Sequence, residues 1–171
     1  MTEDVRRPLG RIAYEQREYA RAAALWLQVV RDDPAWDDEL REWILRAADR
    51  IPPSANRDTP ADVNEIVSVG VRGLYFLEFI DVDGLGGTRV DADDVDAWRQ
   101  DLQDRLTRLL DAMAHDRTPA ADPRLLLASL DVERGLATMS DALKHADEEA
   151  AHRAALTVSA AIRAIGAAGT P

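Results

Sequence analysis

The sequence predicts an all-α protein, in which a helical hairpin and a capping helix pack on a further helical bundle, with about six or seven helices in all. Three observations lead to this fold class. Alanine is abundant, aromatic residues make up only 5% of the 171 residues, and apolar residues recur at intervals of three and four along most of the chain. Such a pattern is typical of helices rather than of strands.

The length suits one domain, so we expect residues 1–171 to form a single helical domain. Its sub-regions are a hairpin plus capping helix (3–51), an acidic helix–loop–helix (59–115) and a C-terminal helical hairpin (122–166). The absence of Cys excludes disulfides and thiolate metal sites. Of the 21 basic residues only Lys144 is a lysine, a bias that we take to indicate a GC-rich bacterial genome.

The same features predict where the protein resides. No stretch reaches the roughly 18 apolar residues that are needed to cross a bilayer, and no apolar run follows the charges at the N-terminus. The lack of Cys fits a reducing compartment. We therefore expect a cytoplasmic protein without a membrane partner.

The first segment predicts two short amphipathic helices with a break near residues 16–18. The positions that carry the pattern are Leu9, Gly10, Ala13, Tyr19, Ala22, Trp26, Val29 and Pro34. This spacing, over residues 3–36, resembles a tetratricopeptide repeat, a helical hairpin of about 34 residues that stacks into protein-binding arrays. In such a hairpin a small Gly10 lets the helices cross closely, and Pro34 ends the second helix.

A third helix follows over residues 36–50, with apolar residues at helical spacing. Because Pro52 and Pro53 stop it, no second hairpin is completed, and we interpret this helix as a cap on the first hairpin. Repeat arrays usually need about three units, so the chain departs from the family here. The later helices must supply the missing contact surface.

The middle of the chain contains an element for which the sequence leaves two alternatives. After a linker at 52–59, residues 65–80 predict a buried helix, and a short β-hairpin around 66–90 remains the alternative because β-branched residues and glycines interrupt the pattern. An acidic, glycine-rich loop then leads into a helix that Asp91, Asp93 and Asp94 cap and that runs to about His115. The last region, from Arg124 to Ile165, predicts two helices with a break near 146–147.

The negative charge of the chain is concentrated in its middle. Residues 58–116 hold 5 Arg against 14 acids, within a total net charge of −11. Such a field disfavours nucleic acids and anionic membranes and favours a basic protein or peptide as partner. The candidate contact residues are Asp93, Asp94, Asp96, Asp101 and Asp104. The alternative is that the charge serves solubility alone.

Two clusters have part of the pattern of a metal site. The loop from Asp81 is similar to an EF-hand, with candidate ligands Asp81, Asp83, Asp91 and Asp94, but in neither register does it supply every oxygen that calcium needs. A tight turn before a capped helix explains it as well. Farther on, Asp141, His145, Glu149 and His152 follow one another at helical spacing, with Glu149 and His152 as one Glu-x-x-His element. Di-iron bundles need two such elements, so an exposed stripe of weak ion pairs is the simpler interpretation.

The leading functional hypothesis is a non-catalytic protein-interaction or scaffold module with an acidic face, which binds a basic protein or peptide. No catalytic residue and no cofactor are assigned, because no phosphate-binding loop, nucleophile elbow or Cys nucleophile is present. One alternative is a small acidic immunity or antitoxin protein, and another is a helical metalloprotein or enzyme. The sequence leaves open a homo-oligomer.

Overall fold

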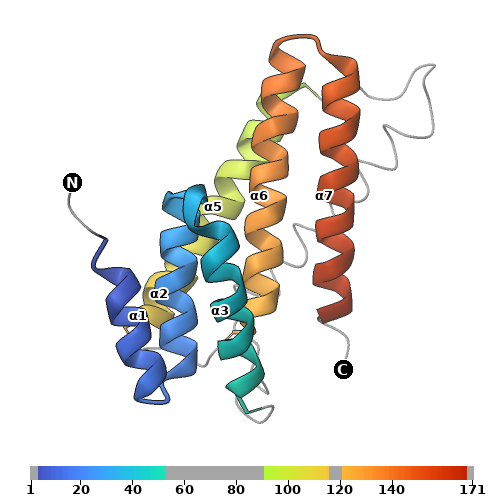
Figure 1. Cartoon of the computed structure of the whole chain (residues 1–171). Coiled ribbons are helices and arrows are strands. Elements are labelled where there is room, and N and C mark those ends of the chain that lie inside the picture. Colours follow the sequence, from blue (N-terminus) through green and yellow to red (C-terminus); the bar gives the residue numbers. More distant parts are fainter. Residues whose placement is uncertain (1–3, 53–90, 116–120, 169–171) are drawn as a thin grey trace. The chain divides into compact units, whose positions relative to one another are not determined.

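The computed structural model describes residues 4–52, 91–115 and 121–168, and nearly all of these residues lie in helices (Figure 1). The helices are α1 (Arg6–Glu15), α2 (Tyr19–Asp32), the 3-10 helix η1 (Pro34–Trp36), α3 (Asp37–Arg50), α5 (Ala92–Ala114), α6 (Pro123–Lys144) and α7 (Glu148–Ala168). The described residues contain no strand, which confirms the all-α prediction. The segment for which helix and β-hairpin were alternatives lies outside the described residues.

The chain divides into two compact units. The first comprises residues 1–63 and 106–127, and the second comprises 64–105 and 128–171. Each predicted sub-region is one continuous segment, whereas each unit consists of two segments. Helices α5 and α6 contribute residues to both units. That the whole chain forms one domain stays a prediction.

The first unit is built on the hairpin of α1 and α2. The predicted break between them is confirmed at residues 16–18, where Arg17 has a φ of 66°. The Glu18 N–H donates to the Ala13 carbonyl at 2.9 Å and the Arg17 N–H to the Tyr14 carbonyl at 3.0 Å. This is the Schellman arrangement, which satisfies the last carbonyls of α1 and reverses the chain.

Trp26 sets how closely the two helices of the hairpin approach. Its side chain is only 3% exposed, and its indole lies where a side chain on Gly10 would be, since a Cβ on Gly10 would come within 2.8 Å of two ring carbons. The indole Nε1–H donates to the Arg7 carbonyl at 3.3 Å. The prediction that Gly10 is small because the helices cross closely is thus confirmed, with Trp26 as the group in contact.

The entry into α3 follows from Asp33 and Pro34. Helix α2 ends at Asp32, and the Asp33 side chain accepts a hydrogen bond from the Ala35 N–H at 3.1 Å to cap η1. Helix α3 then begins with three acidic residues, which suit the positive end of the helix dipole. It buries Leu40, Ile44, Ala47 and Ala48, and it ends at Arg50, just before the two prolines.

The C-terminal part of α5 adds to this unit the surface that the lone hairpin lacks. Its buried residues from 106 to 114 are Leu106, Leu109, Leu110, Met113 and Ala114. A row of polar contacts ties it to α2: Arg21 Nε donates to the Ala114 carbonyl at 3.1 Å, and the buried Gln28 donates to Asp111 at 2.8 Å. The expectation that later helices complete the hairpin therefore agrees with these contacts.

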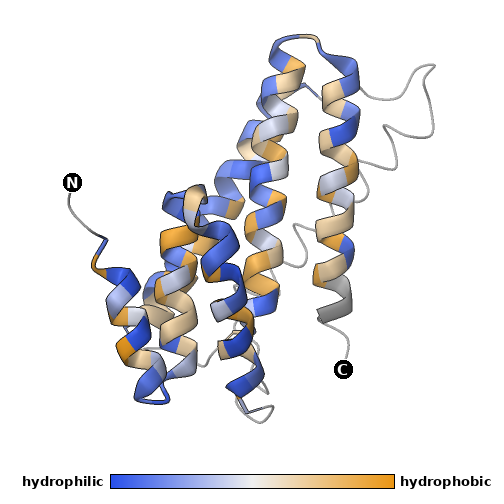
Figure 2. Cartoon of the chain, in the orientation of Figure 1, coloured by the Kyte–Doolittle hydropathy of each residue, from blue (hydrophilic) through white to orange (hydrophobic). Residues whose placement is uncertain are grey.

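The second unit contains residues 92–105 of α5, most of α6, and α7. Glu133 on α6 accepts hydrogen bonds from Arg99 at 2.9 Å and Gln103 at 2.7 Å, both on α5. Gly135 on α6 lets Val158 of α7 approach closely, because a Cβ at this position would collide with the valine side chain. Hydrophilic and hydrophobic residues are interleaved along all the described helices, as amphipathic packing requires (Figure 2). No described helix combines the length and apolarity of a membrane span.

Candidate functional site

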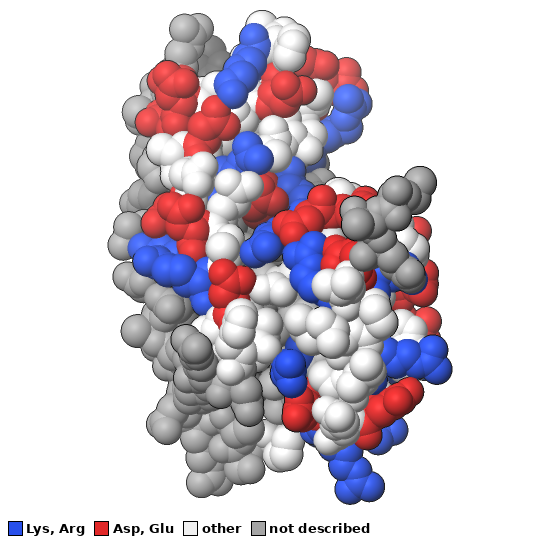
Figure 3. Space-filling model, turned by 90° about the vertical axis from the view of Figure 1, so that its left-hand side faces the viewer, with Lys and Arg blue, Asp and Glu red and all other residues white. Residues whose placement is uncertain are grey.

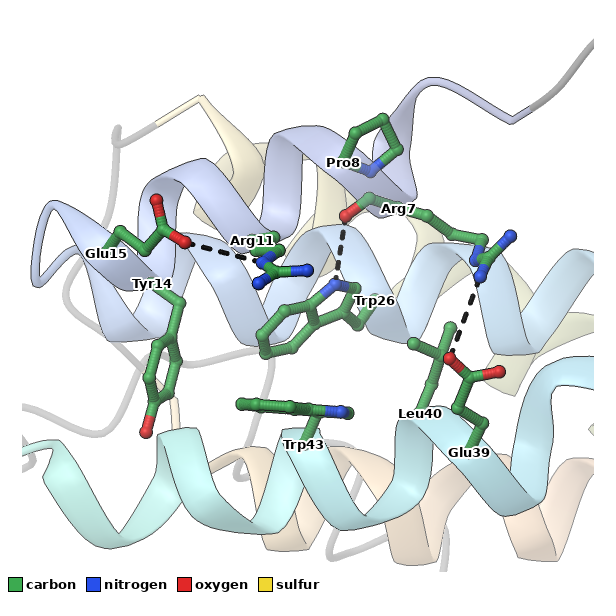
Figure 4. A pocket seen from close by; sticks show the side chains of 9 residues that line it. All are labelled: Arg7, Pro8, Arg11, Tyr14, Glu15, Trp26, Glu39, Leu40 and Trp43. Carbon is green, nitrogen blue, oxygen red and sulfur yellow. Dashed lines mark hydrogen bonds and ion pairs between the residues drawn. The ribbon is translucent and has the colours of Figure 1, made fainter.

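A groove lies between α1 and α3, and its volume is about 440 Å³ (Figure 4). Helix α2 lies behind it and contributes Trp26. The lining residues are Arg7, Pro8, Arg11, Tyr14, Glu15, Trp26, Glu39, Leu40 and Trp43. All of them belong to the first unit, so the site needs no residue from the second.

The floor and walls of the groove are aromatic and apolar. Trp26 and Leu40 are buried, with exposed fractions of 3% and 4%. The Tyr14 ring centroid lies 5.9 Å from that of Trp26 and 5.7 Å from that of Trp43, distances that are typical of interacting aromatic pairs. Trp43 differs from Trp26 because 39% of its surface is exposed. The exposed part of Trp43 therefore adds accessible aromatic surface to the groove.

Arg7 closes one end of the groove. Its guanidinium lies 3.4 Å from the centroid of the Trp36 ring, and Nη2 lies 3.7 Å from Glu39 Oε1, so the side chain bridges α1 and the start of α3. Figure 4 shows Arg7 and Glu39 at one end of the groove and Tyr14 and Glu15 at the other. The buried Arg7 Nε has no hydrogen-bond partner among the described residues. A buried donor of this kind is costly to leave unsatisfied.

The rim of the groove carries charges of both signs. Arg11 and Glu15 form an exposed ion pair at 3.4 Å along α1. On the α3 side, the Arg46 guanidinium lies 4.9 Å from the centroid of the Trp43 ring. No His, Ser or Thr is among the residues that line the groove. Its chemistry suits an apolar side chain on the floor, flanked by polar or charged neighbours at the rim.

All five predicted contact carboxylates lie on α5, but they differ in exposure and in the partners that they bond. Asp93 and Asp94 are exposed in the first turn. Asp96 is engaged, since it accepts from Lys144 at 2.6 Å and from Ser140 at 2.6 Å, and these two bonds hold the pKa of Asp96 below its ordinary value.

The two remaining carboxylates also have intramolecular partners. Asp101 forms an ion pair with Arg105 at 3.1 Å, and Asp104, which is exposed, accepts a hydrogen bond from Gln100 at 3.0 Å. Three of the five carboxylates are therefore already bonded to Lys144, Arg105 or Gln100. Its most accessible members are Asp93, Asp94 and Asp104.

The metal candidates are dispersed. Asp81 and Asp83 lie outside the described residues, and Asp91 acts as a helix cap, accepting from the Asp94 N–H at 2.9 Å. Over residues 4–52, 91–115 and 121–168, no group of three or more His, Asp and Glu side chains is arranged to hold a metal.

The second metal candidate requires a correction, because its four residues do not share a helix. Helix α6 ends at Lys144 and α7 begins at Glu148, so a turn separates Asp141 and His145 from Glu149 and His152. His145 Nδ1 lies 2.8 Å from the Asp141 carbonyl, and Glu149 pairs with Arg153 at 2.8 Å. The expected stripe is thus replaced by two local contacts.

Sequence reasoning missed the groove. Arg7, Arg11 and Trp43 carried no pattern that singled them out as site residues. The available signal was the spacing of Arg7, Arg11 and Glu15 along one side of α1, next to a third helix with its own Trp. Comparison of the chain with models of protein families, with curated proteins and with solved structures found no match in any of the three.

Proposed function

We propose that the chain is a non-catalytic protein-binding module that holds an extended peptide segment of a partner in the groove between α1 and α3. The observation that carries the proposal is the half-exposed Trp43 above a buried aromatic floor. Aromatic side chains that are rigidly held and partly exposed dominate the binding energy of many interfaces, because they bury area at little entropic cost.

The resemblance of residues 3–36 to a tetratricopeptide repeat supports this proposal. In an array of such hairpins the first helices of successive repeats line one side, and here α1 and α3 would take those positions. The ion pair between Arg7 and Glu39 holds the two helices at one end, and the aromatic contacts hold them along the floor. The groove is preorganised, which lowers the cost of ordering it on binding.

The partner segment that fits best has a large apolar side chain for the floor and basic residues around it. The net charge of −11 attracts basic proteins over long range, whereas Glu15 and Glu39 at the rim are already paired with Arg11 and Arg7. Arg7 already binds Glu39 and Trp36, so its charge is partly neutralised. The proposed ligand is therefore a basic peptide with an apolar or aromatic anchor.

Selection from a random peptide library displayed on phage tests the proposal. The expected result is enrichment of peptides that combine a bulky apolar residue with Lys or Arg, and that bind the wild-type chain but lose at least about tenfold in affinity for Trp43→Ala. Leu45→Ala is the matched control, because Leu45 is similarly exposed (38%) on the same helix but does not line the groove. A library without enriched peptides, or peptides that bind Trp43→Ala as well as wild type, would contradict the proposal.

A further inference from the structure

Two polar groups that line the groove between α1 and α3 have no partner in the described part of the chain. They are the Tyr14 hydroxyl and the Trp43 indole N–H, neither of which forms a hydrogen bond with a described residue. Trp26 differs, because its indole N–H donates to the Arg7 carbonyl at 3.3 Å. Tyrosine and tryptophan carry a polar group on an apolar ring, which suits them to surfaces that a ligand covers. The groove thus offers a ligand two donors.

The acceptors of the groove, in contrast, are occupied. Glu15 lies 3.4 Å from Arg11 along α1. Glu39 lies 3.7 Å from Arg7, whose carbonyl is taken by Trp26. A ligand that turned its own N–H groups into the groove would leave them without a partner as it displaces water, and such groups are costly to leave unsatisfied. The groove therefore favours a ligand backbone that accepts hydrogen bonds and does not donate them.

The aromatic surface of the groove suits compact, uncharged rings. The Tyr14 and Trp43 rings stand almost perpendicular, at 84°, with their centroids 5.7 Å apart. Figure 4 shows Tyr14 reaching from α1 towards α3 and Trp43 lying along α3 below Trp26. The Arg46 guanidinium already lies 4.9 Å from the centroid of the Trp43 ring, so a second cation on this ring would meet a like charge. An apolar, uncharged residue is the best occupant here.

Proline meets both requirements, because its side chain is a compact apolar ring and its backbone has no N–H. A run of prolines forms the polyproline II helix, in which every carbonyl is free to accept a hydrogen bond. We infer that the segment held in the groove is proline-rich and binds as a polyproline II helix, with its carbonyls accepting from Tyr14 and Trp43. This inference rests on the proposed function and names the class of peptide. The helix is formed before binding, so little entropy is lost when it docks.

The basic residues of such a segment belong at its ends. Figure 3, which views the molecule from the side on which α1 lies, shows uncharged surface low on the face, bordered by basic and acidic groups. The net charge of −11 attracts a basic segment from a distance. Inside the groove, however, Arg7 and Arg11 already hold the carboxylates. Arginines therefore fit on either side of the prolines rather than among them.

Titration of the purified full chain with three end-blocked peptides of equal charge tests the inference. The first is an oligoproline of L-residues with an arginine at each end. The second is the same peptide built on D-proline, which forms the helix of opposite hand, and in the third alanine and leucine replace the prolines. We expect the L-proline peptide to bind at least about tenfold more tightly than either of the others. The NMR signal of the Trp43 indole N–H, identified by its loss in Trp43→Phe, should shift on binding.

The outcomes separate this inference from the proposed function. Equal binding of all three peptides, preference for the alanine–leucine peptide, or failure of the L-proline peptide to bind would overturn the inference. Enriched peptides in the phage selection would then leave the proposed function intact. A selection without enriched peptides, together with an L-proline peptide that does not bind, would overturn both.

Two conservative variants test the hydrogen bonds. Tyr14→Phe and Trp43→Phe keep an aromatic ring but remove the donor, and each should weaken binding of the L-proline peptide by about threefold to tenfold. Tyr19→Phe is the matched control and should bind like wild type, because the Tyr19 ring lies 5.2 Å from that of Tyr14 but does not line the groove. Circular dichroism establishes that all three variants are folded. Unchanged affinity in both groove variants, or an equal loss in Tyr19→Phe, would overturn the inference.

Discussion

Trp26 and Gly10 form one contact and have to be considered together. The indole is 3% exposed and donates to the Arg7 carbonyl, and it lies directly against the backbone of Gly10. Because protein interiors are closely packed, a buried indole cannot shift to make room for an added side chain without displacing its neighbours. The absence of a side chain at position 10 is therefore what allows α1 to pack on α2.

We predict that Gly10→Ala destabilises the protein by about 1–3 kcal/mol, because overpacking outweighs the gain of up to about 1 kcal/mol in helix propensity. Trp26→Ala should cost about 3–5 kcal/mol as a large buried side chain is lost. In the Trp26→Ala background the sign of Gly10→Ala should reverse, since the new methyl group then enters space that the indole has vacated. Urea unfolding of the four proteins measures the cycle.

The interaction between the two substitutions is the decisive quantity in this cycle. Additive losses would mean that Gly10 serves some purpose other than contact with Trp26. A loss below about 1 kcal/mol for Trp26→Ala alone would contradict its burial and would leave the tetratricopeptide resemblance without its main packing residue.

At the residue scale the sequence predicted roles that depend on size and on local capping. Gly10 as a close-approach residue, Asp91 as part of a helix cap and Pro34 as a helix stop all follow from chemistry that acts within a few residues. The exposure of Trp43 could not be predicted, because the period of α3 gives its apolar face but not which part of that face a neighbouring helix covers. Asp96 illustrates the same limit, since its partner Lys144 is 48 residues away.

At the scale of elements, the turns after α1 and α6 are both Schellman motifs, but neither has glycine at the left-handed position. Arg17 and Ala146 adopt φ values of 66° and 53°, and each is followed by a residue whose N–H closes a Schellman motif. Glycine is the usual residue at this position because it has no Cβ to clash. The helix breaks were predicted from periodicity alone. The left-handed conformation of Arg17 and Ala146 was not predicted, because neither residue is Gly or Asn.

We predict that Ala146→Gly stabilises the protein by about 0.5–1 kcal/mol, since it relieves the left-handed strain at the turn between α6 and α7. The same change at Ala150, inside α7, is the matched control and should cost up to about 1 kcal/mol. Thermal unfolding gives both values. A loss of stability in Ala146→Gly would show that the entropy of the unfolded chain outweighs the strain.

The contact of Asp96 with Lys144 and Ser140 predicts a dependence on pH. Because these bonds lower the pKa of Asp96 in the folded state, they stabilise the protein above the pKa of the unfolded chain and lose that effect as pH falls through the lowered value. Asp96→Asn should therefore lower the melting temperature at pH 7, and the difference from wild type should shrink as pH falls through the lowered pKa of Asp96.

Asp104→Asn, on the same helix, is the control for this comparison, because Asp104 accepts one exposed hydrogen bond from Gln100. Its melting temperature should follow that of wild type over the same pH range. A difference for Asp96→Asn that stays constant as pH falls through the whole acid range would mean that packing, rather than the ionised carboxylate, accounts for the loss.

At the scale of the whole molecule, the sequence predicted the helical class and most helix boundaries. It did not predict that α5 and α6 are each divided between two compact units. Helix periodicity is local, so α3, α5, α6 and α7 appear close to their expected limits. The division into two units depends on contacts between distant segments, such as Gln28 with Asp111. Hydrogen bonds between residues so far apart in the chain carry no signature in a single sequence.

The electric field of the net charge acts over the whole molecule. The structure shows which of the five carboxylates on α5 contribute most to that field. Asp96 and Asp101 have cationic partners of their own, whereas Asp93 and Asp94 make no ion pair among the described residues, and Asp104 accepts only from an amide. A paired carboxylate contributes less to the field felt by an approaching ligand. Recognition by the acidic helix would therefore depend on Asp93, Asp94 and Asp104.

We predict that replacing Asp93, Asp94 and Asp104 with Asn slows association with a selected basic peptide by about threefold to tenfold at low salt, with little change in the dissociation rate, because steering acts on encounter. The wild-type rate should fall steeply from about 50 to about 500 mM salt, and the variant's rate should fall less. Stopped-flow fluorescence measures both rates.

A second triple variant separates the local field from the net charge. Asp141→Asn, Glu148→Gln and Glu149→Gln change the net charge by the same amount at exposed positions around the turn between α6 and α7. If the position of the α5 carboxylates steers the ligand, this control should retain more of the wild-type rate than the α5 variant does. Equal slowing by both variants would mean that only the total charge matters, and unchanged rates in both would identify the acidic residues as a solubility feature.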